Sequence, residues 1–571
     1  MVPYQNYVMT TYRFPEGEAE TILSEASPLV NRLLKTRNIL TAEEAKTFLS
    51  PNYDTEMHDP MLLHDMEKAA VRIELAMAQC EKIAIFSDYD CDGIPGAVVL
   101  HDYFKAIGYE HFQNYIPHRH YEGFGLSTKA IDTLAEAGVK LIITIDCGTS
   151  NIEEVAHANA KGVDVIVTDH HEPGAVLPAA VAIINPKLGS YPFTELCGAA
   201  VVFKLAQALL ARGNYSFIPG FEKWWLDMVA IATIADMVPL RGENRVLARF
   251  GLQVLRKSRR PGLQQLLRKN KVDQRYLTEE DIGFTVGPRI NAASRMDTPE
   301  DAFLMLAATD VVDAGARVEH LEKLNKERKT MVALMTKDLH KRLEHITEIP
   351  KVLVLGNPEW RPSLVGLAAN KLAEEYKCPV FLWGKDGNGV YKGSCRSGGG
   401  VSVVRLMEAA TDSFIEHGGH HFSGGFSVHD EHIFTFGERL NEVLEQLDAE
   451  AAVVEEVSID EVLSLHDVTA ELIRELNTMA PFGKGNPKPL FAFPLVSPRK
   501  VEQFGKAGEH LKLTFETNNG QLEAIAFFAT PDDFQKKPQE QEAFTLLAHV
   551  EQSYFMNRPQ IRLRIVDIIN C

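Results

Sequence analysis

The sequence lacks any long apolar run, which excludes a protein built on membrane-spanning helices. No stretch of about 18 consecutive apolar residues occurs, although apolar residues make up 45% of the chain. The N-terminal segment MVPYQNYVMTTYRFPEG also lacks the basic start and apolar core of a secretion signal. We therefore expect a cytoplasmic protein that does not associate with membranes.

Paired cysteines and an excess of positive charge are also missing. The seven cysteines include no C-x-x-C pair, which argues against a disulfide framework and against a structural zinc site. The formal net charge of −19 disfavours loose adhesion to nucleic acid, but it leaves room for a local basic groove. The composition thus predicts an ordinary globular protein whose function depends on specific sites.

At 571 residues the chain is long enough for three or four domains. Short β-branched runs alternate with helical stretches after residue 76, in KIAIFSD, VKLIITIDCG, VDVIVTDHH and AVAIINP, and this alternation predicts a parallel α/β sheet. Changes of pattern divide the chain into a helical lead-in at 1–75, the α/β domain at 76–310, one long connecting helix at 311–348, a smaller α/β domain at 349–448, and strands of a small β-barrel at 449–571.

Acidic and imidazole side chains follow three successive strands of the predicted sheet. The first strand ends in Asp88, Asp90 and Asp92, the next in Asp146, and the third in Asp169, His170 and His171. A single aspartate at a strand end is more often a turn former than a ligand. Because the carboxyl ends of parallel strands meet at one edge of a sheet, we expect these side chains to lie together.

A further carboxylate, Asp236, follows the helical segment WWLDMVAIATIAD, which also contains Asp227. Asp236 is equally well explained as a residue that caps the end of this helix. Oxygen and imidazole ligands without thiolates suit Mn²⁺ or Mg²⁺. The number of acidic groups exceeds what one ion needs, so we expect two divalent ions about 3.5–4 Å apart.

Taken together, these motifs resemble the DHH phosphoesterases. SDYDCDG, TIDCG, VTDHHEPGAVLPAAVAIINPK and ATIADMVPLRGENRVLARFGL follow the order of that family's motifs, and Asp169-His170-His171 matches the triplet that names it. The segments DIGFTVGPRINAASRMDTPEDAFLML, YKGSCRS, GGHHFSGGFSV and MAPFGKGNPKPLF narrow the resemblance to the RecJ branch, the single-strand-specific 5′ to 3′ DNA exonucleases. It extends from about residue 45 to the end.

The resemblance implies a role for each residue of the acidic cluster. The metal ligands would be Asp90, Asp92, Asp146, His170 and Asp236, with Asp146 bridging the two ions. Asp88, Asp146 and His171 would take part in catalysis. The two ions would activate a water molecule and neutralise the phosphate oxygens, so that no covalent nucleophile is needed.

The resemblance also implies the residues that hold the strand. They are Arg289, Asn291, Arg295, Ser394, Arg396, Gly418, Gly419, His420, Phe482 and Lys484. Glycine-rich loops let backbone amides approach phosphates, although HGGHHFSGG is alternatively a flexible turn. The C-terminal strands resemble an OB-fold, which adds Lys488, Arg499, Lys500 and Phe504 as candidates, although several aromatic residues there would instead belong to the core.

Two further features bear on the assignment. The run RKSRRPGLQQLLRKNK, from Arg256 to Lys271, is either a solvated face or part of the DNA path. Some positions also depart from the family pattern without removing a proposed ligand, namely Phe86, Ser87, the IPG segment after Gly93, Ser294, Cys395 and His421.

We therefore expect a monomeric, two-metal exonuclease that degrades single-stranded DNA from the 5′ end during repair and recombination. Its expected partners are single-stranded DNA, a single-strand-binding protein and a helicase. One alternative is a DHH phosphodiesterase of short oligonucleotides or cyclic dinucleotides, which would not need the C-terminal domain. The other is a catalytically silent single-strand-binding scaffold, against which the intact acidic motifs argue.

Overall fold

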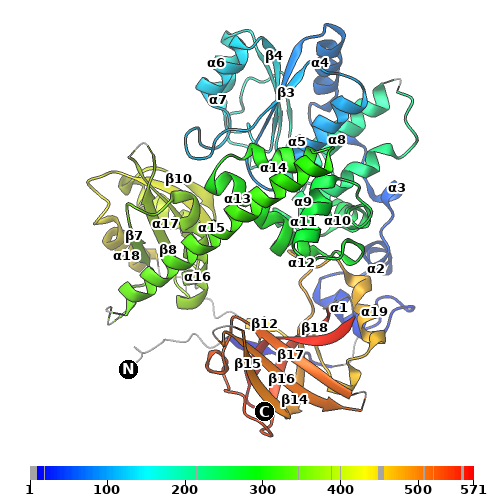
Figure 1. The fold of residues 1–571 in the computed structure, drawn as a ribbon, viewed down its shortest axis with the longest axis vertical. Coiled ribbons are helices and arrows are strands. Elements are labelled where there is room, and N and C mark those ends of the chain that lie inside the picture. The colour runs from blue at the N-terminus through cyan, green and yellow to red at the C-terminus, as the bar shows by residue number, and fades with distance from the viewer. Residues whose placement is uncertain are drawn as a thin grey trace.

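The structure is a computed structural model that describes residues 10–571, apart from residues 18–19, 214, 345, 347, 388, 399, 448–455, 506–507, 519 and 554–558. Figure 1 shows an α/β unit at the top, a second α/β unit at the left and a β-rich unit at the bottom, with the long helix α15 crossing the middle. The boundary expected near residue 450 lies outside the described residues.

Five parallel strands form the first sheet, in the order β3-β2-β4-β5-β6. Their bounds are β2 Lys82–Ser87, β3 Phe112–Tyr115, β4 Val139–Ile145, β5 Asp164–Thr168 and β6 Ala182–Ile184. The sequence predicts four of them but misses the edge strand β3, which is short and only half-buried. The direction of winding reverses between β2 and β4, and this is where parallel sheets open a crevice for ligands.

Alternate residues of β2 face two separate cores, as the period of a strand requires. Ile83 and Ile85 pack in one core and Ala84 and Phe86 in the other. The first core is covered by α4 Met66–Ala78, α5 Gly93–Ala106, α8 Gly198–Arg212 and α9 Leu226–Ala235, and the second by α6 Thr128–Glu136 and α7 Ile152–Ala160.

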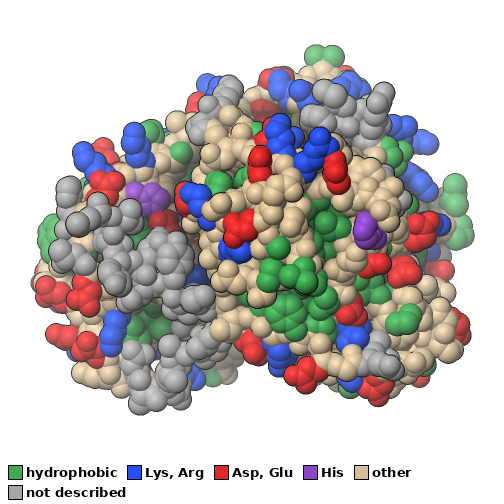
Figure 2. Space-filling view, turned by 90° about the horizontal axis from the view of Figure 1, so that it is seen from below, with side chains coloured by type: hydrophobic (Ala, Val, Ile, Leu, Met, Phe, Trp, Pro, Cys, Tyr) green, Lys and Arg blue, Asp and Glu red, His purple; other side chains and the backbone are tan. Residues whose placement is uncertain are grey.

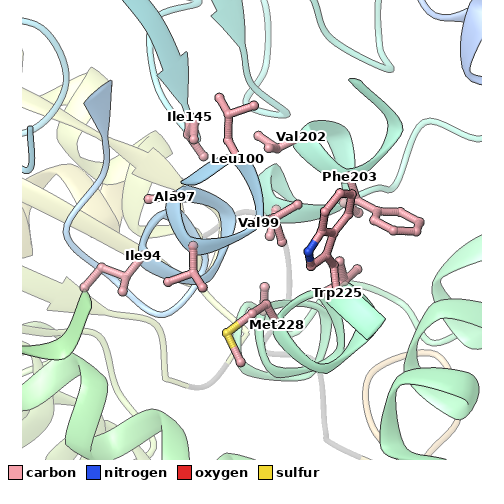
Figure 3. Close-up of a cluster of buried hydrophobic side chains, with 14 of the residues drawn as sticks. Ile94, Ala97, Val99, Leu100, Ile145, Val202, Phe203, Trp225 and Met228 are labelled. Carbon is pink, nitrogen blue, oxygen red and sulfur yellow. The ribbon is translucent and has the colours of Figure 1, made fainter. Parts of the chain in front are cut away.

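Figure 3 shows part of the first core, where α5, β4, α8 and α9 bring buried side chains together. Val99, Phe203 and Trp225 are fully or almost fully buried there. Each such side chain contributes about 1.5–3 kcal/mol when it is removed from water. The elements that carry the acidic residues are therefore held by a large and rigid core.

Helix α15, Val311–Leu343, connects this unit to the next and confirms the predicted long helix, although it ends a few residues before 348. Val318 and Leu321 in its first half pack in the first core, whereas Met335 and Leu339 in its second half pack against α16, Pro362–Tyr376. The helices that precede it are α10 Gly242–Leu255, α11 Pro261–Lys269, α12 Glu279–Asp281, the π-helical turn η4 Ile282–Val286, α13 Gly287–Met296 and α14 Glu300–Ala307.

The second α/β unit contains a five-stranded sheet in the order β10-β11-β9-β8-β7. Its strands are β7 Leu353–Gly356, β8 Val380–Lys385, β9 Tyr391–Arg396, β10 Phe414–His420 and β11 Ser423–Val428, and α17 Val403–Ala409 and α18 Phe436–Leu447 pack on it. The segment HGGHHFSGG forms the β10–β11 hairpin, in which His420 pairs with Ser423. It is therefore a paired hairpin and not an irregular turn.

The C-terminal unit is a seven-stranded sheet in the order β13-β14-β18-β19-β17-β16-β15. The strands are β13 Glu461–Val462, β14 Phe491–Val496, β15 Lys500–Phe504, β16 His510–Thr517, β17 Gly520–Phe527, β18 Phe544–Ser553 and β19 Gln560–Ile569. The last four contain the runs from which the sequence predicts strands. The sheet is mostly antiparallel, but β13 pairs with β14 in parallel and β17 pairs with β19 in parallel.

The helical lead-in predicted at 1–75 does not stand apart, because α4 covers the first core and the first two helices complete the core of the C-terminal unit. Leu33, Leu34 and Phe48, from α1 Pro28–Thr36 and α2 Ala42–Leu49, are buried against this sheet and α19, Ala470–Met479. The first strand β1, Thr11–Arg13, also pairs with β12, Glu456–Ser458. Thr41 caps α2, because its hydroxyl accepts the N–H of Glu44 at 3.2 Å.

Among the described residues, none of the helices has the length and apolar character that would let it cross a bilayer.

Candidate metal centre and substrate surface

The carboxyl ends of three neighbouring strands bring the predicted acidic residues to one edge of the first sheet. The N–H of Asp88 donates to the carbonyl of Ile145 at 3.0 Å, and the N–H of Asp146 donates to that of Thr168 at 2.9 Å. Each aspartate thus extends the ladder by one residue beyond its strand. Their carboxylates project into the crevice where the winding of the sheet reverses.

Asp92 is fixed by the N-terminus of α8. Its Oδ2 accepts the N–H of Gly198 at 2.6 Å and its Oδ1 accepts the N–H of Ala199 at 2.7 Å. Asp90 closes the loop before it, because Oδ1 of Asp90 accepts the N–H of Asp92 at 2.8 Å. The free N–H groups of a helix N-terminus stabilise negative charge, so α8 holds Asp92 in place.

Asp146 occupies a left-handed backbone conformation with φ of 60°, which is uncommon for a residue other than glycine. A Cβ atom on Gly198 would lie 2.6 Å from the Cβ of Asp146, so only glycine leaves room for this carboxylate. Such local constraint clusters at functional sites. It aims Asp146 at the other acidic residues.

His170 lies among three carboxylates. Its Nε2 is 3.2 Å from Oδ1 of Asp146, 3.6 Å from Oδ2 of Asp92 and 3.8 Å from Oδ2 of Asp236. Burial and the charge of His171 lower the pKa of His170 to about 4. The imidazole is therefore neutral at physiological pH, with a lone pair available for a metal ion.

Among the described residues, this crevice holds three groups of side chains, and within each group the ligand atoms lie within 4.8 Å of one another. The groups are Asp88, Asp90 and Asp146, then Asp92, His170 and Asp236, and finally Asp146, His170 and His171. Asp146 and His170 each belong to two groups. The geometry therefore brings together all five residues proposed as metal ligands. It adds Asp88 and His171 as further candidate ligands.

Burial makes the ionised form of these carboxylates costly. It is the main reason why the pKa values of Asp88 and Asp146 are raised, and mutual repulsion raises them further. The same two causes raise the pKa of Asp92 to about 7 and that of Asp236 to about 8. Within the described part of the chain, Oδ1 of Asp88 and Oδ1 of Asp146 are buried without a hydrogen-bond partner.

These orphaned oxygens and the carboxylate and imidazole donor set fit divalent ions such as Mn²⁺ or Mg²⁺. A bound cation would remove the mutual repulsion and satisfy the free oxygens. The crevice therefore meets the requirements of the two-ion site that the sequence predicts.

Asp169 belongs to none of these ligand groups and orients its neighbours instead. Its Oδ1 lies 2.7 Å from Nδ1 of His171, and its Oδ2 accepts the N–H of Thr149 at 3.0 Å. Burial alone would lower the pKa of His171, but the hydrogen bond to Asp169 and the nearby carboxylates raise it to about 9. His171 is half-exposed and carries its charge at neutral pH.

Asp227 is not part of the metal cluster, because it lies in the first turn of α9 whereas Asp236 follows the last turn. Its Oδ2 accepts hydrogen bonds from Ser258 at 2.9 Å and from Arg260 at 2.8 Å. Arg260 also pairs with Asp102 at 2.6 Å. The basic run 256–271 is thus partly structural, because Arg260 is committed to these two carboxylates.

Four arginines lie close to one another beside the acidic crevice. Burial, Arg119, Arg328 and Arg396 together lower the pKa of Arg295 to about 9, while Asp90 acts in the opposite direction. Among the described residues, none of these four arginines forms an ion pair with a carboxylate. In a chain of net charge −19, such a cluster indicates a binding site for an external anion.

Arg119 and Arg328 were missed by the sequence reasoning. Arg119 lies in the loop PHRHYEG and stacks over the ring of Tyr89 at 4.7 Å, and Arg328 lies in α15. For Arg119, the arginine between two histidines in HRH was the one available signal. Arg328 gave no signal, because an arginine in a long charged helix resembles any solvated residue. Only the fold places them beside Arg295.

Two of the proposed substrate-binding residues have structural partners instead. Nε of Arg289 donates to Oε1 of Glu322 at 2.9 Å, and its side chain is almost fully buried. Oδ1 of Asn291 accepts the N–H of Cys91 at 3.1 Å. Arg289 therefore braces α13 against α15, and Asn291 holds the loop between Asp90 and Asp92.

The residues proposed from the second unit lie on β9 and β10. Nη1 of Arg396 donates to the carbonyl of Cys395 at 2.7 Å, and a Cβ on Gly366 of α16 would lie 2.9 Å from Nη2. Ser394 also lies beside Gly366, while Gly418, Gly419 and His420 lie on β10. Burial, Lys484 and Arg396 lower the pKa of His420, so these three groups lie close together.

In the C-terminal unit, the loop around Phe482 reaches the catalytic unit. The N–H of Leu240 donates to the carbonyl of Lys484 at 2.8 Å, and the charge of the exposed Lys484 acts on Asp236. The other candidates, by contrast, have partners. Lys488 pairs with Glu280 and Glu551, Arg499 with Glu516, and Lys500 with Glu502, while Phe504 packs against His510.

Figure 2 views the molecule from below. Among the residues drawn in colour, Lys and Arg alternate with Asp and Glu on this face and form no continuous basic stripe. Lys484 is therefore the candidate of this unit that is best placed to act near the metal cluster.

The departures from the family pattern lie outside the proposed ligand set. Phe86 is buried and stacks on Tyr115, while Ser87 is buried beside it on β2. Cys395 packs against Met407, and His421 against Phe422. Ser294 lies on α13 and donates to the carbonyl of Asn291.

Models of known families match three regions of the chain, namely the N-terminal domain of the DHH family at 82–233, the DHHA1 domain at 350–452 and the RecJ OB domain at 459–567. The single-stranded-DNA-specific exonuclease RecJ of Salmonella typhimurium is 32% identical over 532 residues, which cover 89% of this chain and 90% of that protein. The chain belongs to the RecJ family. The resemblance inferred from the motifs is thereby confirmed.

The corresponding RecJ of Bacillus subtilis is 36% identical over 88% of this chain, but the match spans only 63% of its length. Among solved structures, RecJ of Thermus thermophilus in complex with Mn²⁺ matches with a TM-score of 0.82 and 26% identity, covering 98% of this chain and 80% of that one. The same protein in complex with Mg²⁺ matches with a TM-score of 0.76 and 25% identity. A RecJ fold with divalent ions therefore agrees with the donor set described above.

Proposed function

We propose that the protein is a metal-dependent 5′ to 3′ exonuclease that hydrolyses single-stranded DNA. The observation that carries this proposal is the acidic crevice with its overlapping ligand groups, which faces four arginines that pair with no carboxylate of the described chain. Cations bound by the acidic crevice would therefore lie next to phosphates bound by the arginines. Membership of the RecJ family supports the choice of substrate.

The ligand groups suggest how two ions would be held. Asp88, Asp90 and Asp146 would bind one, Asp92, His170 and Asp236 the other, and Asp146 would contribute to both. Such ions supply a water of lowered pKa and neutralise charge on the phosphate. The protein's part is to fix the carboxylates, which the N-terminus of α8 does for Asp92 and the left-handed backbone does for Asp146.

His171 would act on the substrate and not as a ligand. Its Nδ1 is held by Asp169, which leaves the proton on Nε2 directed away from that carboxylate. A protonated imidazole beside the crevice can donate a hydrogen bond to a phosphate oxygen and stabilise the negative charge that develops there. Asp169 would be a positioning residue for this contact.

Arg396 would bind a phosphate through its guanidinium, with Ser394, His420 and Lys484 close by. A planar guanidinium can grip a phosphate with two parallel hydrogen bonds. Arg289 and Asn291 are better assigned to the support of α13 and of the ligand loop. Arg295 remains a candidate phosphate ligand, although one of its N–H groups donates to the carbonyl of Ser363 at 2.6 Å.

The polarity of cleavage and the setting of the reaction rest on the family relation. We infer a cytoplasmic monomer that acts in DNA repair and recombination, together with a single-strand-binding protein and a helicase. The C-terminal unit favours a long substrate over a short oligonucleotide or a cyclic dinucleotide, because its Phe482 loop reaches the catalytic unit. The intact ligand groups favour an enzyme over a silent scaffold.

The test is cleavage of single strands labelled at either end. We expect a 5′-labelled 30-mer to release labelled mononucleotide at once in Mn²⁺ or Mg²⁺, and a 3′-labelled strand to shorten stepwise, with no cleavage in chelator. A duplex of the same sequence and a dinucleotide serve as competing substrates. Faster turnover of the dinucleotide, or release first from the 3′ end, would contradict the proposal.

A further inference from the structure

Three arginines of the catalytic unit follow one another at intervals of four residues. Arg241 directly precedes α10, and Arg245 and Arg249 lie within this helix. Residues four apart lie along one face of a helix, so these three side chains form an arginine stripe. All the hydrogen bonds of the stripe within the described chain go to backbone carbonyl groups. Buried charges usually pair with an opposite charge, so this choice of acceptors is unusual.

Arg245 lies in the middle of the stripe and is only 2% exposed. Its Nε donates to the carbonyl of Phe48 at 2.6 Å, and its Nη2 donates to the carbonyls of Thr478 at 3.4 Å and Ala480 at 3.1 Å. The guanidinium also lies over the ring of Phe48, 3.6 Å from the ring centre. Burial is the main reason why the pKa of Arg245 is lowered to about 9. The protein thus keeps a costly buried cation at this position.

Arg245 and Arg249 cap two helices of the C-terminal unit at once. Phe48 and Leu49 are the last two residues of α2, and Thr478 lies in the last turn of α19. Nη1 of Arg249 donates to the carbonyl of Leu49 at 2.7 Å and to that of Thr478 at 3.4 Å. The last carbonyl groups of a helix lack backbone partners and carry a partial negative charge, which arginine donors satisfy. The stripe therefore joins α10 of the catalytic unit to the core of the C-terminal unit.

The Phe482 loop, residues 480–487, begins at this capped end of α19 and is held again near its own end. Nε of Arg241 donates to the carbonyl of Gly485 at 2.8 Å, and its Nη2 donates to the carbonyl of Arg37. Nε of Arg37 in turn donates to Oδ1 of Asn486 at 2.7 Å, and Asn486 is fully buried. The arginine stripe therefore fixes both ends of the loop.

The loop brings the exposed Lys484 to the edge of the metal cluster. A Cβ atom on the preceding Gly483 would lie 2.9 Å from Cδ1 of Leu240, so only glycine allows this close approach. The N–H of Leu240 donates to the carbonyl of Lys484 at 2.8 Å, and the charge of Lys484 acts on Asp236. The position of this cation thus depends on how the loop is held.

We propose that Arg245 is a positioning residue, which holds Lys484 beside the metal cluster so that its ammonium group binds a phosphate of the strand. The inference rests on the proposed function and deepens it, because Arg245 is too deeply buried to touch the strand itself. A loop that is fixed in advance loses less conformational entropy on binding, which increases affinity. Arg241 would share this role from the other end of the loop.

A double-mutant cycle on single-stranded 30-mers in Mn²⁺ tests this dependence. We expect Lys484→Ala and Arg245→Met each to raise KM about tenfold with little change in kcat, because both remove the same charge-assisted contact. The double variant should be no weaker than either single variant, whereas independent effects would multiply to about a hundredfold. Arg245→Lys should restore only part of the loss, because one ammonium group cannot reproduce the fork that spans two helices.

Two further variants separate positioning from general stability. Arg241→Met repeats the cycle at a position that is only partly buried and therefore less important for folding. Arg72→Met is the matched control, because Arg72 pairs with Glu81 at 2.8 Å and Asp164 at 2.6 Å, where β2 and β5 begin, at the edge of the sheet opposite the metal cluster. The control should lower the free energy of unfolding in urea but leave KM unchanged.

The cycle also defines the results that would overturn the inference. These are a normal KM in folded Arg245→Met or Arg241→Met, and effects of Arg245→Met and Lys484→Ala that multiply. An increase of KM in Arg72→Met equal to that in Arg245→Met would reduce the effect to stability and would also overturn it. Failure of the proposed function would look different, since the wild type would then cleave no single strand.

Discussion

The carboxylate of Asp169 lies 2.7 Å from Nδ1 of His171, so the first residue of the D-H-H triplet orients the third. The same Oδ1 accepts the backbone N–H of His170 at 2.7 Å. Asp169 therefore shapes the turn after β5 and holds a positive imidazole beside the crevice. Asp169 would therefore contribute to catalysis by orienting His171.

Replacing Asp169 by asparagine should change the titration of His171. The carboxylate keeps the pKa of His171 at about 9, and without it burial should bring the value down by at least about one unit, towards the ordinary 6.5. Histidine NMR titration of the metal-free protein would show this shift. If His171 still titrated near pH 9 in Asp169→Asn, the neighbouring carboxylates and not Asp169 would hold its charge.

The metal-free protein should become less stable as the pH rises from about 4 to 8. The folded-state pKa is about 7 for Asp92 and about 8 for Asp236, against about 3.9 for an unfolded aspartate. Between these values the folded state binds more protons than the unfolded state, so the free energy of unfolding falls as the pH increases. The loss is complete about one pH unit above the higher of these two folded-state pKa values.

Urea denaturation at pH 5, 6.5 and 8 would measure this effect by comparing the wild type with Asp236→Asn, whose side chain does not ionise. We expect the free energy of unfolding of the metal-free variant to exceed that of the wild type by about 1–3 kcal/mol at pH 8, and the two values to be closer at pH 5. Saturating Mn²⁺ should reverse the order, because the ion binds the folded wild type more tightly. A difference that did not depend on pH would show that Asp236 ionises normally.

Gly198→Ala should weaken metal binding without unfolding the protein. The new Cβ would lie 2.6 Å from the Cβ of Asp146, so the carboxylate must move away from its proposed partners. We expect the Mn²⁺ concentration for half-maximal activity to rise at least about tenfold, since a ligand displaced by about 1 Å loses its geometry. Gly315→Ala in α15 is the control, because a Cβ there meets no described atom within 4 Å.

Arg396 should affect the substrate and not the metal. We expect Arg396→Ala to lower kcat/KM on single strands by roughly 10–100-fold, and Arg396→Lys to restore little, because an ammonium group cannot form two parallel hydrogen bonds. The Mn²⁺ titration should be unchanged. Arg275→Ala, an exposed arginine paired with Asp273, should behave like the wild type. A shifted Mn²⁺ titration with normal KM would assign Arg396 to the metal side.

Much of the catalytic unit could be predicted from the sequence because its signals are local. Apolar runs followed by Asp88, Asp146 and Asp169 mark strand ends, and parallel strands bring such ends to one edge. What each carboxylate does there was not predictable. Asp169 and Asp88 are both aspartates that directly follow a strand. Asp169 nevertheless hydrogen-bonds to His171, whereas Oδ1 of Asp88 has no hydrogen-bond partner among the described residues.

The contacts between distant segments could not be predicted. Nothing in the sequence of α1 and α2 indicates that Leu33 and Phe48 pack with strands more than 400 residues later. The arginine cluster is similar, because Arg119, Arg328 and Arg396 come from a loop, a helix and a strand of different units. Deleting the C-terminal unit would expose the buried side of α1 and α2, so point variants test its role more cleanly.

The number of Mn²⁺ ions bound per chain tests the central claim most directly. Equilibrium dialysis of the wild type should give two, and Asp146→Asn should give at most one and abolish cleavage, because Asp146 is the ligand that the two proposed ions share. Asparagine tolerates the left-handed backbone at this position, so the variant should remain folded and should still bind single-stranded DNA. A single ion in the wild type, or two ions and more than about a tenth of normal turnover in Asp146→Asn, would contradict the two-ion account.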